Sequence, residues 1–196
     1  MRPQEPASAS NPAAPVMDAE AIRRALRRVA HEIIERNREL ASVVLAGIPL
    51  RGGESAHRLG EIIHGIEKIH LEIGIIDVAM HRDDVGQRAD LPMVQTSHLP
   101  LPLDHRTVII VDDVLFTGRT CRAAMDAISS FGRPARIQLA ALIDRGHREL
   151  PIRADYVGKN LPTAANERVR VRLGHAEGDG VWLVKQKSAA SEQMAT

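Results

Sequence analysis

The chain has 196 residues, 44% of them hydrophobic, and its charged residues nearly cancel to a formal net charge of +1. This length and apolar content suit a single domain with a substantial core, and the balanced charge excludes a global electrostatic attraction to RNA. A single cysteine, Cys121, excludes an internal disulfide, and the nine histidines have no spacing typical of metal ligands.

The two ends of the chain differ in composition from its middle. The first sixteen residues are rich in Pro, Ala and Ser, lack the apolar segment of a signal peptide, and leave Met17 as an alternative start. We therefore expect disordered tails over residues 1–17 and 187–196, on either side of one domain at 18–186. No run approaches the ~18 apolar residues of a membrane span, so we expect a cytoplasmic protein without a membrane partner.

Hydrophobic periodicity alternates between helix and strand across this domain. Apolar residues at helical spacing from Ile22 to Ile34, with Asp18 as the N-cap, predict an amphipathic helix over 18–39. Further helices are expected over 55–66 and 121–131, and strands over 42–48, 70–80 (one strand or two), 108–111, 136–143, 168–173 and 181–184. Strands that alternate with helices predict a doubly wound α/β sheet.

Residues 83–106 interrupt this alternation. They contain four Gly or Pro residues and show weak periodicity, and a long irregular segment inside a compact domain is usually functional or disordered. One interpretation is a surface loop. The other is a functional lid that closes over a bound substrate and keeps water from its reacting atom.

The segment 107–120, with the sequence TVIIVDDVLFTGRT, joins a buried strand to a helix. Asp112 and Asp113 come at the carboxyl end of the strand, where open α/β sheets place their ligands. Their acceptor-only carboxylates suit the vicinal hydroxyls of a ribose, and the turn 117–120 presents backbone N–H groups and a helix dipole to a phosphate. The segment predicts a ribose-phosphate site; the alternative is a surface turn whose acids only cap the helix.

A second glycine-rich turn, residues 47–53, follows the first predicted strand and contains Arg51. Its backbone N–H groups and the guanidinium are suited to a diphosphate, although glycine turns are common and the signal is weak by itself. In a parallel sheet this turn would lie beside 107–120. The chain lacks the G-x-G-x-x-G fingerprint and the Walker lysine, which disfavours dinucleotide and P-loop sites.

Three segments resemble a known family. Residues 107–120 are similar to the phosphoribosyl pyrophosphate (PRPP) motif of type I phosphoribosyltransferases, and 144–160 and 21–32 are similar to the PyrR family of pyrimidine-operon regulators. The similarity covers roughly residues 18 to 184. It implies a type I phosphoribosyltransferase fold, with a central, mostly parallel sheet flanked by helices, a small hood and a flexible lid loop.

The resemblance also implies a reaction, the transfer of phosphoribosyl from PRPP to uracil to give UMP and pyrophosphate. Arg51, Asp112 and Asp113 are the implied catalytic residues, and Mg²⁺ is carried by PRPP, with no protein side chain assigned as a metal ligand. The implied PRPP-binding residues are Leu50, Arg51, Gly52, Arg82, Val111, Asp112, Asp113, Val114, Leu115, Phe116, Thr117, Gly118, Arg119 and Thr120.

Two residues depart from the pattern of the family. Leu50 stands before the arginine of the second turn, where threonine is usual, so one hydroxyl that could bind the diphosphate is missing. We expect weaker PRPP affinity or turnover than the family norm. Phe116 stands where tyrosine is common, and we expect little effect from that change.

Regulation is the second activity that the resemblance implies, through binding of UMP or UTP and of leader mRNA from pyrimidine operons, by attenuation or translational control. The candidate RNA-binding residues are Arg24, Arg27, Arg28 and Arg36 on the first helix, with Arg145, His147, Arg148, Arg153 and Lys159. Arginines on a helix are more often a solvated face. Two alternatives remain open: a nucleotide sensor with little catalysis, and a phosphoribosyltransferase for another base. A homo-oligomer, a dimer or higher, is expected from the family.

Overall fold

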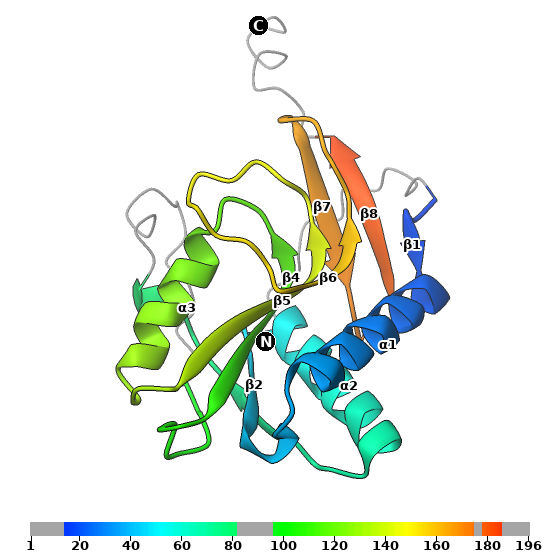
Figure 1. The fold of residues 1–196 in the computed structure, drawn as a ribbon. Coiled ribbons are helices and arrows are strands. Elements are labelled where there is room, and N and C mark those ends of the chain that lie inside the picture. Colours follow the sequence, from blue (N-terminus) through cyan, green and yellow to red (C-terminus); the bar gives the residue numbers. More distant parts are fainter. Residues whose placement is uncertain (1–13, 82–95, 175–177, 186–196) are drawn as a thin grey trace, which may run out of the picture.

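The computed structural model describes residues 14–81, 96–174 and 178–185. Within them, five parallel strands form the central sheet in the order β3-β2-β4-β5-β6 (Figure 1). These strands are β2 (Val43–Gly47), β3 (Glu72–Ile75), β4 (Thr107–Leu115), β5 (Arg136–Asp144) and β6 (Tyr156–Asn160). β2 and most of β4 are buried, as unbroken apolar runs predict for parallel strands covered on both faces.

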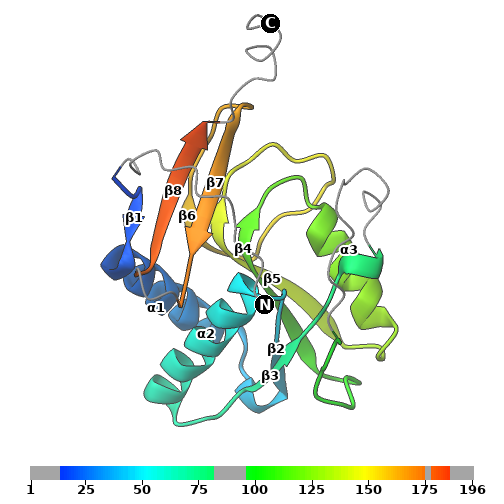
Figure 2. The ribbon, with the colours of Figure 1, turned by 180° about the vertical axis from the view of Figure 1, so that it is seen from behind.

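Helices cover both faces of this sheet. α1 (Ala19–Arg36) and α2 (Arg51–Glu67) lie on one face and α3 (Arg119–Ser129) on the other, as Figure 1 and the view from behind in Figure 2 show. Alternate residues of β2 divide between the two layers, because Leu45 packs in the core cluster of α1 and α2 while Val44 and Ala46 pack in the cluster of α3. Two short 3₁₀-helices, Leu40–Ser42 and Ala79–His81, complete the helical segments that the structure describes.

The first helix follows from its sequence. Asp18 caps α1, and its carboxylate accepts a hydrogen bond of 2.7 Å from the backbone N–H of Ala21, as the pattern predicts. The helix ends at Arg36, three residues before the predicted end, because Asn37 turns inward. The Asn37 side chain is 6% exposed and donates to the carbonyl of Ile33 and the hydroxyl of Tyr156.

A second, antiparallel sheet forms the hood above the central sheet (Figure 1). In the described residues it has three strands in the order β1-β8-β7, namely β1 (Met17–Asp18), β7 (Glu167–Arg172) and β8 (Gly180–Lys185). We expected a disordered tail through residue 17, and here the structure differs. Val16 donates to the carbonyl of Val181, and Met17 is only 3% exposed, because its side chain completes the apolar contact between the hood and α1.

The hood is tied to α2 by one arginine. Arg58 in α2 donates from Nε to Glu54, at 2.7 Å, and from its terminal nitrogens to Asp179, while the backbone N–H of Gly174 also donates to Asp179. The hydrogen bond from Asp179 raises the pKa of Arg58. This bridge joins the first turns of α2 to the hood.

Three further expectations can be compared with the structure. β6 was not predicted: its Tyr156 is 1% exposed and donates from its hydroxyl to Gln138. The proposed lid at 83–106 lies mostly outside the described residues, and the part that is described begins with a backbone pairing of Ile75 and His98. In the segments that the structure describes, no helix is long and apolar enough to cross a membrane.

Candidate active site

Three connections meet at the carboxyl edge of the central sheet. They are the turn from β2 to α2, the turn from β4 to α3 and the segment that follows β5. The register places Gly47 beside Val111 and Val111 beside Ala140, so the ends of these three strands are neighbours. The parallel sheet therefore brings the two turns singled out in the sequence next to each other.

The two acids lie inside β4, not beyond it, because the strand continues to Leu115 and the predicted one ended at residue 111. Asp112 is 7% exposed and its Oδ1 accepts the backbone N–H of Asp113 at 2.9 Å. The side chain of Asp113 is 21% exposed, and its Oδ2 lies 3.9 Å from Nη1 of Arg51. Arg51 and Asp113, which the sequence places in separate turns, are thus brought together, and of the two acids Asp113 is the more exposed.

The turn from β2 to α2 is unusually close to β4. The N–H of Ile48 donates to the carbonyl of Val111 at 2.9 Å, and a Cβ on Gly52 would lie 2.5 Å from that same carbonyl oxygen. We expected 47–53 to be a turn, but α2 already begins at Arg51. Glycine at this position permits backbone contact with the strand that a side chain would prevent.

Leu50 occupies a rare conformation in this turn. Its φ is 70° and ψ is −105°, and its side chain is 73% exposed. Positive φ is costly for a residue with a branched side chain and is found mainly where surrounding structure enforces it, often at functional sites. The residue that departs from the family pattern is therefore also the strained residue of the turn.

The turn from β4 to α3 is held from outside by the segment after β5. The carbonyl of Thr117 accepts N–H groups from Glu149 and Leu150 at 3.0 and 3.1 Å, and the guanidinium of Arg119 pairs with the Glu149 carboxylate at 2.8 Å. Gly118 has a φ of 95° and stands at the N-cap of α3. These contacts hold the turn at 117–118 in place at the amino end of α3.

Arg148 belongs to the same support. Its guanidinium donates to the carbonyls of Phe116 at 2.8 Å and Ile152 at 2.9 Å, and also to the Asp144 carboxylate. We expected Arg148 to contact RNA. In the structure its guanidinium nitrogens donate to groups of the protein itself. A phosphate of RNA would have to bind to nitrogens that already make these hydrogen bonds.

A cavity of about 470 Å³ opens beside this turn, between the strand ends and the hood. Arg145 forms one wall: it is 6% exposed, and its guanidinium lies 4.0 Å from the ring centroid of Phe116. Its nitrogens donate to Thr163 Oγ1 and to the carbonyl of Glu167. Burial, followed by the charge of Arg168, lowers the pKa of Arg145.

The lining of this cavity was predicted only in part, because Val114 and Phe116 were expected to bind PRPP but the residues on the hood side were missed. The lining comes from β4 and the turn after it, from the residue after β5, and from β7 with the connection before it. It comprises Val114, Phe116, Arg145, Ala165, Glu167, Arg168 and Val169. These residues are scattered over the chain with no common spacing. Only the resemblance pointed to Arg145, and there as an RNA contact.

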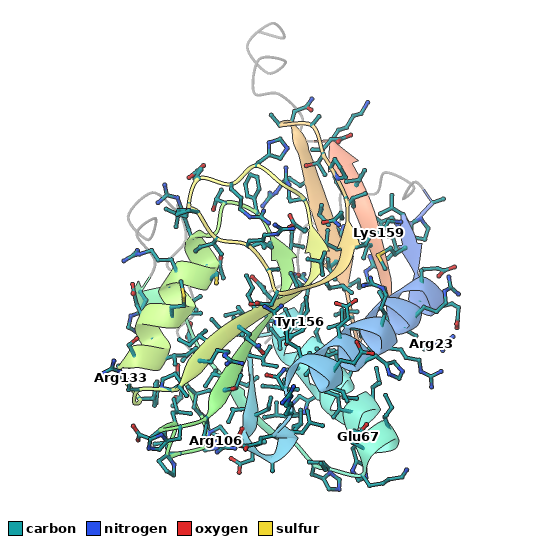
Figure 3. The ribbon with its side chains drawn as sticks, in the orientation of Figure 1. Arg23, Glu67, Arg106, Arg133, Tyr156 and Lys159 are labelled. Carbon is teal, nitrogen blue, oxygen red and sulfur yellow. The ribbon has the colours of Figure 1, made fainter. Side chains whose placement is uncertain are left out.

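The remaining RNA candidates fall into two groups. α1 packs along β6, which brings Arg28, Arg36 and Lys159 to one side of the molecule, the side where Figure 3 labels Lys159 and Tyr156. Arg28 donates to the carbonyls of Val157 and Gly158, and Arg36 pairs with Asp155 at 3.0 Å. Arg24 and Arg27, which lie beside Ile62 of α2, and Arg153 in the segment between β5 and β6 are exposed. His147 contacts the carbonyl of Thr163 near the cavity. Arg82 lies outside the described residues.

Comparison with known proteins gives consistent results. The family model for the phosphoribosyl transferase domain matches residues 16–176. A bifunctional protein PyrR from Chloroflexus aurantiacus is 55% identical over 174 residues, which cover 89% of this chain and 96% of that relative. The protein of the same name from Roseiflexus sp. is 52% identical over 172 residues, covering 87% and 94%.

Solved structures share the fold at low identity. The HGPRT-ase from Leishmania tarentolae in complex with GMP has a TM-score of 0.69 at 15% identity, covering 90% of this chain and 98% of that chain. Hypoxanthine phosphoribosyltransferase from Trypanosoma cruzi in complex with the product IMP has a TM-score of 0.67 at 18% identity, covering 96% and 98%. The residues that match the family model include all five strands of the central sheet. About half of the residues aligned with the two PyrR relatives are identical. The chain thus belongs to the phosphoribosyl transferase domain family and, within it, to the family whose members are named bifunctional protein PyrR.

Proposed function

We propose that this protein transfers the phosphoribosyl group of PRPP to uracil and also binds leader mRNA of pyrimidine operons under the control of uridine nucleotides. The observation that carries the enzymatic half is the junction of β4 and α3, where Asp112 and Asp113 precede an open turn and Asp113 meets Arg51. Membership of the PyrR family supports the regulatory half.

Each part of PRPP has a counterpart at this junction. The carboxylates of Asp112 and Asp113 accept hydrogen bonds from the ribose hydroxyls. Residues 114–120 surround the 5-phosphate, which the amide groups at the start of α3 attract. Arg51 lies beside the diphosphate, with Leu50, Gly52 and the more distant Arg82 completing its surroundings.

The chemistry is electrostatic. The bond from C1 to the pyrophosphate oxygen breaks, the bond from C1 to N1 of uracil forms, and N1 loses its proton. Negative charge grows on the departing pyrophosphate, where Arg51 stabilises it, and positive charge grows on the ribose above Asp113. No side chain is required as a nucleophile.

Magnesium is proposed to arrive bound to PRPP. Among the described residues no group of three or more His, Cys, Asp or Glu gathers to hold a metal ion. Mg²⁺ is commonly held by one or two carboxylates together with substrate phosphates and water, and Asp112 and Asp113 fit that donor set. Bound there, the ion would neutralise charge on the pyrophosphate.

The cavity at Arg145 and Phe116 is the proposed site of the base. It adjoins the turn that holds the phosphate end of the ribose, and its lining combines one aromatic ring with buried donors. Backbone and guanidinium groups there can hydrogen-bond the carbonyl oxygens of a pyrimidine. We assign specificity for uracil to this cavity.

The direct test is formation of UMP from uracil and PRPP, with hypoxanthine, guanine and orotate as competing bases. We expect uracil to be used in preference to the other three by at least roughly a hundredfold in kcat/KM, as a site with base-specific hydrogen bonds allows. Preference for a purine would instead establish a phosphoribosyltransferase for another base. No product from any base, with UMP still bound, would establish the nucleotide sensor, an alternative that the missing hydroxyl at Leu50 makes worth testing.

Restoring the family residue at Leu50 gives a second prediction. In Leu50→Thr the new hydroxyl can donate to the diphosphate, and one such hydrogen bond contributes about 1 kcal/mol, so the KM for PRPP should fall roughly fivefold. Leu50→Val is the matched control, since it has the shape of threonine and carries the same backbone strain without the hydroxyl. Equal KM values in the two variants would contradict the role of a missing hydroxyl.

Regulation follows from the same nucleotide site. A nucleotide that favours the RNA-competent state must be held more tightly when RNA is bound, because the coupling of two ligands is reciprocal. The exposed arginines of α1 and the residues of β6 are the proposed RNA surface, and a homo-oligomer would present several such surfaces. Because PRPP and leader mRNA are cytoplasmic in bacteria, the protein is proposed to act there.

A further inference from the structure

The hood has a row of arginines that the proposed function does not use. Residues of β7 alternate between the two faces of the hood sheet: Val169 and Val171 pack against the core, while Arg168, Arg170 and Arg172 point to the other face. Arg168 and Arg170 are exposed, and Arg172 is half-buried. Three successive outward positions therefore carry the same charge.

The neighbouring strand β8 places no acid directly opposite these three arginines. The antiparallel register places Arg168 opposite Val184, Arg170 opposite Trp182 and Arg172 opposite Gly180. None of these cross-strand partners is an acid, whereas like charges side by side on a strand repel. The outer face of β7 and β8, which we call the hood face, is thus basic with one aromatic ring.

Trp182 lies flat on this face. A Cβ on Gly180 would lie 2.3 Å from the indole ring, so the ring rests against the backbone at that glycine. The Arg172 guanidinium carbon is 5.0 Å from the ring centroid, within the range of a cation–π contact. The indole and the arginine row form one continuous surface.

We propose that the hood face binds the sugar–phosphate backbone of RNA, as a surface separate from α1 and β6. Guanidinium groups bind phosphate oxygens through paired hydrogen bonds, and residues two apart on a strand are separated by roughly 6.8 Å, close to the spacing of phosphates along an extended strand. The row begins at Arg168, which also lines the cavity of the proposed base site, so the hood face leads directly to the nucleotide.

A solvated strand face is the simpler interpretation. Charged residues on an edge strand such as β7 also prevent aggregation through edge pairing. Positive charges, negative charges or a mixture of both would prevent such aggregation equally well. Protection of the edge therefore does not require three arginines beside the only tryptophan of the chain. The hood face is therefore better explained as a binding surface for a polyanion, because its charged row consists entirely of arginines and lies beside one tryptophan.

Trp182 makes the proposal directly measurable. Because the chain has a single tryptophan, emission excited at the red edge of the absorption band reports on this ring alone. The probe is a synthetic hairpin RNA with the leader sequence of a pyrimidine operon. We expect saturable quenching or a shift of Trp182 emission, with the same midpoint as binding measured by gel shift.

A charge-matched pair of variants tests the arginines. Arg170→Gln with Arg172→Gln removes two charges from the hood face, and neither residue lines the cavity. Arg133→Gln with Arg136→Gln removes two exposed charges at the opposite edge of the central sheet, where Figure 3 labels Arg133. The hood variant should bind RNA roughly tenfold more weakly, and the slope of log K against log salt should be lower by about 1.4. The control should change by less than twofold in affinity.

The proposal rests on the RNA-binding half of the proposed function, and the two can fail separately. A hairpin that does not bind the wild-type protein in either assay overturns both. Binding with unchanged Trp182 emission and with equal salt slopes in wild type and hood variant overturns the hood face alone. UMP formation by the hood variant should equal that of the wild type, and its loss would mean that the substitutions act through the catalytic site, which also overturns a separate surface.

Discussion

Asp113→Asn is expected to reduce kcat for UMP formation by roughly a thousandfold while leaving the stability of the fold nearly unchanged. The amide retains the size of the carboxylate but loses the charge that lies 3.9 Å from Arg51 and that we propose faces the ribose. Removing one preorganised electrostatic group from a transition state typically costs a factor of 10² to 10³ or so. The side chain is partly open to solvent, so its pairing with Arg51 contributes little to stability.

The neighbouring acids provide the comparison. Asp112→Asn should lose similar activity and, in addition, about 1 to 2 kcal/mol of unfolding free energy, because it places an amide NH2 donor where a buried acceptor oxygen stood while Oδ1 can still accept the N–H of Asp113. Asp126→Asn, an exposed acid of α3, should alter neither quantity. Steady-state kinetics with urea unfolding on all three variants decides the matter. If Asp113→Asn keeps more than a tenth of wild-type kcat, the ribose role is wrong.

Gly52→Ala is expected to reduce kcat by roughly a hundredfold and to destabilise the protein by about 2 kcal/mol. The added methyl group would lie 2.5 Å from the carbonyl oxygen of Val111 and 3.3 Å from Cα of Asp112. Overpacking against backbone typically costs 1 to 3 kcal/mol or so. To relieve it, the start of α2 must move away from β4, which separates Arg51 from Asp113, and a shift of about 1 Å at a reacting group can cost 10²-fold.

Another glycine of the same helix is the control. Gly65 has no heavy atom within 4 Å of its ideal Cβ position, so Gly65→Ala should stabilise the protein by about 0.5 kcal/mol and leave activity intact. Thermal unfolding with the UMP assay tests both variants. A Gly52→Ala protein with normal kcat would show that α2 can shift without disturbing the site.

The catalytic edge of this protein was largely predictable because its signals are local. The acids of β4 and the turn at Gly118 are adjacent in sequence, and a buried strand followed by such a turn indicates a phosphate site without knowledge of distant contacts. The start of α2 was placed too late, since Gly52 and Gly53 have poor helix propensity. Gly52 is explained by its contact with β4 and Gly53 by its contact with Ile75 of β3, and sequence periodicity shows neither contact.

The features that sequence analysis missed depend on distant residues. β6 is a short strand with exposed residues at its end, and it is recognisable only by Tyr156 packing with Asn37 and Gln138. The cavity at Arg145 combines three separate segments, so no motif could indicate it. Two strands of the hood, β7 and β8, were predicted at 168–173 and 181–184, but β1 was missed, because Val16 and Met17 lie in a segment whose composition suggests disorder.

The bridge at Arg58 has a mechanical consequence. It links the hood to α2, the helix whose first residue is Arg51. A movement of the hood would therefore displace α2 and, with it, the end of the helix that we propose lies beside the diphosphate. Arg58→Met would remove this link and leave the apolar contacts between the hood and α1 in place. We therefore expect both ligands still to bind and the coupling between nucleotide and RNA to become weaker.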